Sequence, residues 1–259
     1  MDIQQYIAAD KELLLNLNGS QSLFWDGFMW VATSTIVWVP VAAMLLYIII
    51  KNNKIQEALL TIVMIALVIT LADQIASGLC KPFFARFRPT QDPNIMYMVD
   101  IVNGYRGGRF GFISSHAANT FAISVFLSLL IKRKSLTFML LFWAVLNSYS
   151  RIYLGVHYPG DILFGTIEGC FIGYLIYLLY KFIQKKIFYF FLNSLRPPII
   201  SPLSPHPPFP VWYVFFFYFF GFFALIIFVS LLKNPKKFFF FFFPPLFFFF
   251  SFFFFFFFF

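Results

Sequence analysis

The sequence has few charged residues, and this shortage excludes several classes of protein. Only 11% of its 259 residues are charged, whereas globular proteins carry about 25%. Hydrophobic residues make up 61% of the chain, and its mean hydropathy is +0.83. This composition excludes a soluble globular domain and a disordered chain. The net charge of +9 does not indicate a nucleic-acid-binding protein, because the apolar content is far too high.

Cysteine is scarce as well. Cys80 and Cys170 have neither the spacing of a metal site nor the pattern of a disulfide framework. The length of the chain is instead enough for several membrane-spanning helices of roughly 20 residues each. We therefore predict an all-α fold, a multi-span transmembrane helical bundle.

Acidic residues are absent from the last third of the chain, which differs in composition from the rest. All ten acidic residues lie between Asp2 and Glu168, and 30 of the 44 phenylalanines follow Lys186. The segment 187–259 is rich in Pro and Phe, and a run of one bulky residue specifies no unique packing. We interpret this tail either as the product of a shifted reading frame or assembly error, or as a genuine hydrophobic anchor. No function is assigned to it.

The remaining sequence predicts a surface helix followed by a transmembrane domain over 22–186. Residues 1–21 mix apolar and charged side chains, as in an amphipathic helix that lies at the membrane surface. Five apolar stretches follow, near residues 23–50, 58–79, 117–131, 136–147 and 161–182. We therefore expect about five core spans, with a long polar segment between the second and the third.

Basic residues divide the loops of this bundle into two groups. The loops at 51–54, 132–134 and 181–186 carry eight Lys or Arg and no acid, so the positive-inside rule assigns them to the cytoplasm. The amino terminus, the segment 80–115 and the link 151–160 then lie on the extracytoplasmic face. We predict a multi-pass protein of the cytoplasmic (inner) membrane.

The extracytoplasmic face also carries basic residues, which the positive-inside rule does not explain. Six of them lie in the segment 80–115 and the link 151–160: Lys81, Arg86, Arg88, Arg106, Arg109 and Arg151. A requirement to bind an anion is the simplest reason for their presence. The alternative is that they pair with lipid headgroups or with Asp92 and Asp100.

Two histidines fall on this same face. His116 follows two serines at the start of the third span, and His157 lies just before the fifth. Asp161 comes four residues after His157, and Pro159-Gly160 between them predicts a turn, with Asp161 near the cap of the following helix. Two histidines among several cations and a carboxylate indicate chemistry rather than a structural role.

Phosphoryl transfer accounts for these residue types. A phosphoester dianion needs cations and N–H donors around its oxygens, because charge spreads over them in the transition state. Basic side chains, a serine hydroxyl and the N–H groups at the start of a helix all meet this need. Imidazole can act as nucleophile or as acid near neutral pH. A carboxylate can hold one imidazole nitrogen so that the other is free to attack.

Three motifs in 81–161 resemble those of a known family. The first is Lys81, six residues, then Arg88-Pro89; the second is Ile113-Ser114-Ser115-His116; the third is Ser150-Arg151, five residues, His157, three residues, Asp161. By the order and separation of these motifs, residues 57–183 resemble the type 2 phosphatidic acid phosphatase superfamily. The three spaced motifs together are specific, whereas Lys-x6-Arg-Pro alone would arise often by chance.

The resemblance implies a role for each motif residue. His157 would attack phosphorus to form a phosphohistidine, and Asp161 would orient it. His116 would protonate the leaving oxygen and then activate water. The implied phosphate-binding residues are Lys81, Arg88, Ser114, Ser115 and Arg151. Members of this family need no metal, so the resemblance implies neither a metal site nor a cofactor.

The second motif departs from the family pattern, Pro-Ser-Gly-His, at two positions. Ile113 replaces Pro, which we expect to matter little. Ser115 replaces Gly, which reduces backbone freedom. If the turn requires a positive φ there, Ser115 is strained; if it is an ordinary helix start, Ser115 fits.

The implied function is that of an integral-membrane lipid phosphatase with its active site on the extracytoplasmic face. Its substrate would be a phosphomonoester or pyrophosphate on a membrane lipid, such as undecaprenyl pyrophosphate or phosphatidic acid. The alternatives are a lipid phosphotransferase, a vanadate-dependent haloperoxidase and a non-catalytic anion or lipid transporter. The membrane-embedded chain argues against the haloperoxidase, and sparse intramembrane charge argues against the transporter.

One such intramembrane charge, Asp73, could brace Lys81 or make a structural helix–helix hydrogen bond. The sequence makes no prediction of the oligomeric state.

Overall fold

The computed structural model of the chain describes residues 2–20, 22–194 and 221. Within these residues the protein is helical and has no strand beyond one isolated bridge, which confirms the predicted all-α fold. The helices are α1 (Ile3–Leu17), α2 (Leu23–Thr33), α3 (Thr35–Asn52), α4 (Ile55–Asp73), η1 (Gln74–Cys80), α5 (Lys81–Phe84), η2 (Pro89–Gln91), η3 (Val102–Gly104), α6 (Ser115–Ile131), α7 (Lys134–Tyr153) and α8 (Pro159–Ser194). Apart from 187–194 and 221, the Pro/Phe-rich tail lies outside the described residues.

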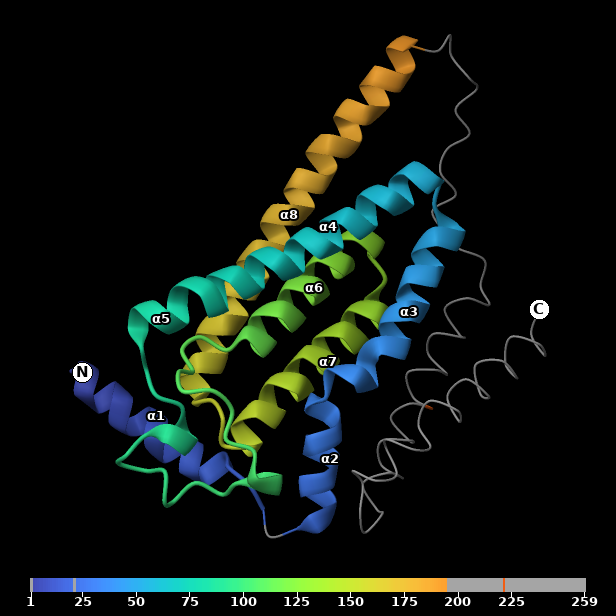
Figure 1. Ribbon diagram of the computed structural model, residues 1–259. Helices are drawn as coiled ribbons and strands as arrows, with labels where there is room; N and C mark the ends of the chain where they lie inside the picture. Colours follow the sequence, from blue (N-terminus) through green and yellow to red (C-terminus); the bar gives the residue numbers. More distant parts are fainter. Residues whose placement is uncertain (1, 21, 195–220, 222–259) are drawn as a thin grey trace.

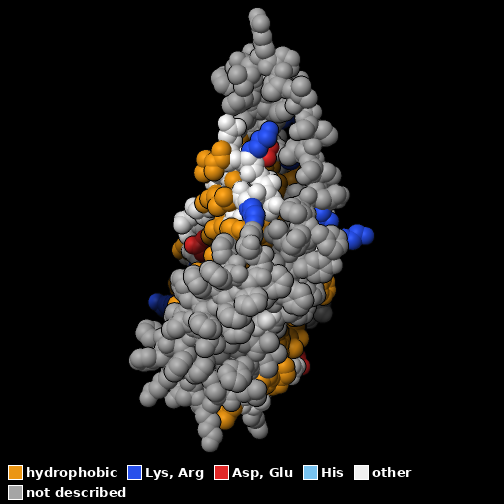
Figure 2. All heavy atoms as spheres, turned by 90° about the vertical axis from the view of Figure 1, so that its right-hand side faces the viewer, with side chains coloured by type: hydrophobic (Ala, Val, Ile, Leu, Met, Phe, Trp, Pro, Cys, Tyr) orange, Lys and Arg blue, Asp and Glu red, His pale blue; other side chains and the backbone are white. Residues whose placement is uncertain are grey.

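Three helical stretches of the described chain are long and apolar enough to cross a membrane. They are Thr35–Asn52, Ile55–Phe84 and Pro159–Lys186, and α6 is a shorter apolar helix. Many large hydrophobic side chains of α3, α4, α7 and α8 are exposed, as lipid-facing side chains are. On the side shown in Figure 2 the described side chains are mainly hydrophobic, and charged ones are few. The chain is therefore a multi-pass membrane protein.

The first predicted span, 23–50, is not one continuous helix. It is divided at Ser34 into α2 and α3, because three hydroxyl residues in a row favour helix ends over helix interiors. The carbonyl of Ala32, which the break frees, accepts hydrogen bonds from Trp38 Nε1 at 2.7 Å and Asn147 Nδ2 at 3.4 Å. Thr33 is the last residue of α2, and its hydroxyl contacts a side chain of the polar site.

Small residues bring α6 and α8 into close contact, and α6 packs more extensively against α8 than against any other helix. Gly165, Gly169 and Gly173 recur every four residues along α8 and face the backbone of α6. A Cβ added at Gly165 would lie 2.6 Å from the Ser114 carbonyl oxygen. Such stripes of small residues allow membrane helices to approach closely. The start of α6 therefore lies directly beside the start of α8.

The polar segments gather at one end of the bundle. Figure 1 shows α1, the segment 85–114 and the α7–α8 link at one end, and the α3–α4 and α6–α7 junctions at the other. The helix α1 packs there through Leu14, which is buried in a small cluster with Tyr158 and Ile152. Its side chains Ile3 and Tyr6 are exposed. All three predicted motifs thus lie at the end that carries α1.

Candidate active site

The turn before α8 holds His157 and Asp161 against each other. Pro159 is the first residue of α8, where its missing N–H costs nothing, and Asp161 lies in the first turn. Asp161 Oδ2 accepts hydrogen bonds from the Tyr158 backbone N–H at 3.0 Å and from His157 Nδ1 at 3.3 Å. The same carboxylate therefore caps the helix and fixes the imidazole, as the sequence predicts. Nε2 is left as the nitrogen of His157 that can react.

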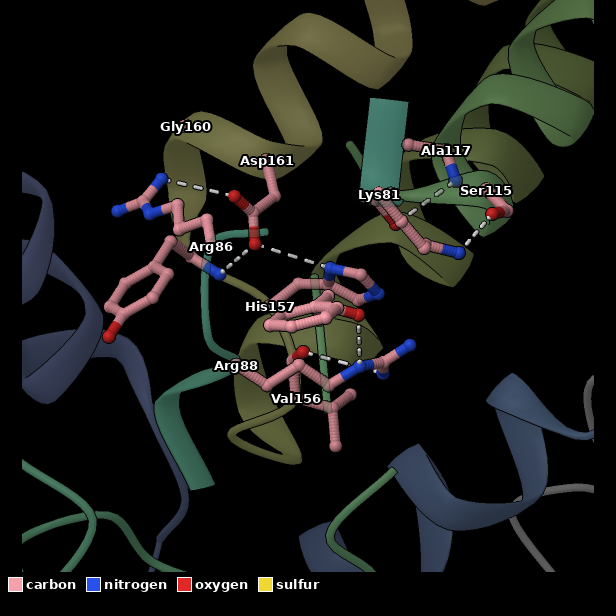
Figure 3. Close-up of polar contacts among 12 residues, drawn as sticks. Lys81, Arg86, Arg88, Ser115, Ala117, Val156, His157, Gly160 and Asp161 are labelled. Carbon is pink, nitrogen blue, oxygen red and sulfur yellow. Dashed lines mark hydrogen bonds and ion pairs between the residues drawn. The ribbon is translucent and has the colours of Figure 1, made fainter. Parts of the chain in front are cut away.

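The environment of His157 keeps its imidazole neutral. Burial, followed by the positive charges of Arg88, Arg151 and Lys81, holds the pKa of His157 well below its usual value of 6.5. A neutral imidazole has the lone pair that a nucleophile needs. Figure 3 shows the edge of the ring that is remote from Asp161 turned toward the side chains of Lys81 and Arg88.

Packing around this pair leaves little room for a side chain at Gly111. A Cβ there would lie 3.0 Å from Asp161 Oδ2 and 3.6 Å from His157 Nδ1. The Gly111 N–H donates to the Arg86 carbonyl oxygen at 2.9 Å, which joins the segment after α5 to the segment before α6. A side chain at Gly111 would therefore press against the histidine–aspartate pair.

His116 lies at the start of α6, within electrostatic reach of His157, Arg88 and Lys81. Ser114 caps this helix, its hydroxyl accepting from the Ala117 N–H at 3.5 Å. The Ser114 N–H donates to the Asp161 carbonyl oxygen at 3.1 Å, which links the two helix starts directly. The two predicted histidines therefore belong to one site at one end of the bundle.

Lys81 is the first residue of α5, near the end of the helical stretch Ile55–Phe84, and its side chain reaches the site. Its Nζ donates to Ser115 Oγ at 2.6 Å and to Ser77 Oγ at 3.0 Å (Figure 3 shows the first bond). Ser77 in turn approaches Asp73 Oδ1 at 3.3 Å, so Asp73 reaches Lys81 through one hydroxyl. Ser77 lies in the π-helical turn η1, a feature common at functional sites. Of the two roles considered for Asp73, this geometry favours the bracing of Lys81.

Arg88 is buried and held by backbone carbonyls. Its Nε donates to the Phe110 oxygen at 3.1 Å, and Nη1 lies 3.5 Å from the Val156 oxygen. Burial, and then the charge of Arg151, lowers the pKa of Arg88, but an arginine remains charged at neutral pH. Neutral carbonyl partners leave its positive charge uncompensated, as an anion-binding guanidinium requires.

Arg151 is fixed by residues from two other segments. Its Nη1 donates to Thr33 Oγ1 at 2.8 Å, and its Nη2 donates to the Tyr105 hydroxyl at 3.3 Å. The side chain is buried, and its Nε has no hydrogen-bond partner among the described residues. Lys81, Arg88 and Arg151 thus present three cations to His157, and each is held by neutral partners.

Ser115 adopts an ordinary helix-start conformation. It is the first residue of α6, and it is not among the described residues with a positive φ. The replacement of Gly therefore introduces no backbone strain, which agrees with the milder of the two interpretations. The added hydroxyl is a partner of Lys81 rather than an obstacle.

Four residues beside the site were not predicted to take part in it: Ser77, Thr33, Tyr105 and Asp10. Arg86 was noted only as an unexplained basic residue, and it contacts Asp161 at 3.0 Å. Ser77 could have been found from its position one helical turn before Lys81. The other contacts span more than 40 residues of sequence and carry no local signal. Among the described residues no group of three or more His, Cys, Asp or Glu could hold a metal ion.

Comparison with known proteins agrees with this geometry. The family model for the PAP2 superfamily matches residues 62–185, which include all three motifs. A lipid A 4'-phosphatase of Bacteroides thetaiotaomicron is 47% identical over 171 residues, which are 66% of this chain and 76% of that protein. The chain belongs to the PAP2 superfamily. The predicted resemblance is thereby confirmed, and with it the assignment of the protein as a phosphatase.

Other PAP2 relatives give the same assignment. A lipid A 4'-phosphatase of Porphyromonas gingivalis is 34% identical over 71% of this chain and 78% of that protein. An undecaprenyl-diphosphatase of Sulfolobus acidocaldarius is 30% identical over 66% of this chain and 79% of that protein. The crystal structure of a transmembrane PAP2-type phosphatidylglycerolphosphate phosphatase from Bacillus subtilis has the same fold. Its TM-score is 0.53 at 22% identity, over 71% of this chain and 88% of that one.

Proposed function

We propose that this PAP2 protein hydrolyses a phosphate ester of a membrane lipid through a phosphohistidine at His157. The observation that carries the proposal is the placement of His157. Its Nδ1 is held by Asp161, and its Nε2 edge is turned toward the cations of the site. A neutral imidazole among three cations suits in-line attack on a phosphate dianion.

The reaction takes place in two steps. Burial and then the nearby cations lower the pKa of His116 to about 3 in the free protein, so in this proposal His116 takes up its proton when the phosphate dianion binds beside it. In the first step, Nε2 of His157 forms a bond to phosphorus as the ester P–O bond breaks, and His116 gives that proton to the leaving oxygen. In the second, His116 takes a proton from water, whose oxygen attacks phosphorus and breaks the N–P bond. Asp161 stabilises the positive imidazole that exists between the two steps.

The phosphate oxygens are bound by the three cations and by the start of α6. Lys81, Arg88 and Arg151 neutralise the charge that spreads over the oxygens in the transition state. The Ser114 hydroxyl and the Ser115 N–H add donors at the positive end of the helix. These groups come from the chain itself, and the proposed reaction uses no metal ion.

The preferred substrate in this proposal is the 4'-phosphate of lipid A. The relatives of 47% and 34% identity carry the name lipid A 4'-phosphatase, and the relative of 30% identity is an undecaprenyl-diphosphatase. Either lipid would keep its chains in the bilayer while its phosphate enters the polar end of the bundle.

The site is proposed to face the extracytoplasmic side of the inner membrane. Eight Lys or Arg lie in the loops at 51–54, 132–134 and 181–186, and the first two of these loops are at the end of the bundle remote from His157. In this orientation α1 lies on the outer surface of the bilayer, with Ile3 and Tyr6 exposed toward it.

Phosphate release in detergent tests the function. We expect the purified protein to release inorganic phosphate from lipid A with EDTA present. His157→Ala should reduce release below detection, and His116→Ala should lower the rate by about 10²–10⁴-fold, the usual contribution of general acid–base catalysis. His206→Ala changes the third histidine of the chain, outside the described residues, and serves as the matched control.

Three results would contradict parts of the proposal. Activity lost with EDTA and restored by a divalent metal would contradict the metal-free reaction. Loss of lipid phosphate without release of inorganic phosphate would indicate a phosphotransferase. Faster release from undecaprenyl pyrophosphate or phosphatidic acid than from lipid A would contradict the preferred substrate but not the class of reaction.

A further inference from the structure

One acidic side chain of α1 reaches the turn that carries His157. Asp10 Oδ1 accepts from the Gly160 backbone N–H at 2.7 Å, across 150 residues of sequence. Asp10 Oδ2 accepts from Arg86 Nη2 at 2.7 Å. The helix α1 is therefore joined to the start of α8 both directly and through an arginine.

Arg86 bridges two carboxylates beside the site. Its Nη1 lies 3.0 Å from Asp161 Oδ1 while its Nη2 contacts Asp10, and its guanidinium carbon lies 4.0 Å above the ring of Tyr158. Figure 3 shows Arg86 on the side of Asp161 that is opposite His157. The Asp161 side chain is fully buried, whereas that of Arg86 is 24% exposed. Arg86 is thus fixed by Asp10, Asp161 and the ring of Tyr158, and it lies on the side of Asp161 that is remote from His157.

We propose that Arg86 and Asp10 are positioning residues for catalysis: Arg86 orients Asp161 for His157, and Asp10 holds Arg86 in place. This proposal rests on the proposed roles of His157 and Asp161. Neither Arg86 nor Asp10 touches the reacting phosphate in it, and both act through the carboxylate.

The two oxygens of Asp161 have different partners, and this difference is the physical reason for the proposed role of Arg86. Oδ2 accepts from His157 and from the Tyr158 N–H, whereas Oδ1 accepts from Arg86. In the part of the chain that the structure describes, Arg86 is the one Lys or Arg within 4.0 Å of this carboxylate. A buried carboxylate without a counter-charge is strongly disfavoured. Burial raises the pKa of Asp161 to about 6, and the charge of Arg86 opposes this rise. Arg86 therefore favours the ionised carboxylate and fixes its plane when His157 becomes positive.

Arginine suits this position better than lysine. Its planar fork donates two parallel sets of hydrogen bonds to two carboxylates and stacks on an aromatic ring. A lysine at position 86 could supply the charge but could not bridge Asp10 and Asp161 in one plane. Arg86→Lys should therefore recover part of the activity that Arg86→Gln loses.

A second contact of α1 provides a matched control. Lys11, next to Asp10, lies 2.8 Å from Asp92 Oδ2, and the Tyr158 hydroxyl donates to the same oxygen at 2.8 Å. This ion pair also fastens α1 to the bundle, but among the described residues neither Lys11 nor Asp92 forms an ion pair with Arg86 or Asp161. Lys11→Met should loosen α1 without altering the orientation of Asp161.

Steady-state kinetics with lipid A in detergent micelles tests the proposal. Because a small misplacement of a catalytic group costs about 10²-fold, we expect Arg86→Gln to lower kcat by about 10–100-fold, with KM within about 3-fold. Asp10→Asn, which keeps an acceptor for Gly160, should lower kcat by about 3–10-fold. Because the two residues act in one chain of contacts, adding Asp10→Asn to Arg86→Gln should cost less than about 2-fold more.

The outcomes separate this proposal from the proposed function. If the wild-type protein releases no phosphate from any lipid, the proposed function is overturned, and these roles with it. If the wild type is active and Arg86→Gln keeps its kcat, only the positioning role is overturned. Equal losses of kcat in Lys11→Met and Asp10→Asn would also overturn it, because docking of α1 would then be the cause. A kcat that recovers in Arg86→Lys at an unchanged unfolding temperature would support it.

Discussion

At the scale of single residues, the site is built from charged groups whose partners are neutral. Lys81 contacts two serines, Arg88 contacts two carbonyl oxygens, and Arg151 contacts a threonine and a tyrosine. A charge paired with a carboxylate would have little attraction left for a phosphate, whereas neutral partners fix the geometry and preserve the field. The Asp161 carboxylate contacts His157 and Arg86 instead of these three cations.

The first prediction at this scale concerns the hydroxyl of Ser115. Ser115→Gly restores the family pattern, and it removes the 2.6 Å bond to Lys81 while the backbone N–H remains. A hydrogen bond to a charged group contributes about 1.5–3 kcal/mol. Because Lys81 keeps its bond to Ser77, we take the lower limit and expect KM to rise about 10-fold with kcat within about 2-fold. Lys81→Met serves as the reference and should lower kcat/KM far more. An equal effect of the two substitutions in phosphate-release kinetics would contradict this role.

The pKa of His157 gives a second prediction at this scale. Because burial and the nearby cations lower it in the folded protein, the unfolded chain binds more protons below pH 6.5. The titration of His157 therefore leaves the free energy of unfolding unchanged above pH 6.5 and lowers it as the pH drops below that value. At one unit below 6.5 the loss amounts to about 1.4 kcal/mol.

Thermal unfolding in detergent measures this effect. The fall in unfolding temperature between pH 7.5 and pH 5.5 should be smaller in His157→Gln than in the wild type. Comparing the two pH values within each protein removes the effect of the substitution itself. Equal falls in both proteins would show that the imidazole of His157 titrates as it does in the unfolded chain.

At the scale of elements, close helix contact decides where the motifs meet. The glycines of α8 let α6 approach until Ser114 and Asp161 share a backbone hydrogen bond of 3.1 Å. The end of α2 has a similar effect, because Thr33, its last residue, holds Arg151. Both features lie outside the three motifs, and both determine the positions of motif residues.

Gly169→Ala tests the contact between α6 and α8. A Cβ there would collide with the Ala118 carbonyl oxygen, which belongs to a rigid backbone. Overpacking of this kind costs about 1–3 kcal/mol, so we expect a lower unfolding temperature and lower phosphatase activity. Gly108→Ala is the matched control, because nothing lies within 4 Å of its Cβ position and its φ is not positive. The same unfolding temperature in both variants would contradict the close packing.

At the scale of the whole molecule, one end of the bundle is polar and the rest suits a bilayer. The long apolar helices and their exposed hydrophobic side chains provide the membrane-spanning part. The motifs, α1 and the segment 85–114 gather at one end (Figure 1). A lipid in the surrounding leaflet can therefore present its headgroup to the site without leaving the membrane.

Cysteine labelling tests which side of the membrane this end faces. In a background with Cys80 and Cys170 replaced by serine, Arg106→Cys should react with a membrane-impermeant maleimide in intact spheroplasts. Asn53→Cys, at the opposite end, should react only in inside-out vesicles, because its loop is assigned to the cytoplasm. The reverse pattern would contradict the proposed orientation.

The sequence by itself determined that this protein lies in a membrane and which residue types are available for its chemistry. Its apolar runs require a membrane, and its three motifs supply the histidines, the aspartate and the proposed phosphate-binding residues at fixed local spacings. Such properties depend on composition and short-range pattern, which the chain carries along its length. Apart from residue 221, the tail beyond residue 194 lies outside the described residues. The reading-frame error and the hydrophobic anchor therefore both stay predictions from the sequence.

Only the tertiary structure decided which residues surround those motifs. Asp10 meets Arg86 and Gly160, and Thr33 meets Arg151, across more than 70 residues of sequence in each case. Contacts of this length follow from helix packing, to which the glycines of α8 contribute, and a local pattern cannot encode them. At the break at Ser34, the bond from Trp38 to the freed Ala32 carbonyl is local, whereas the bond from Asn147 forms only once α7 packs beside it.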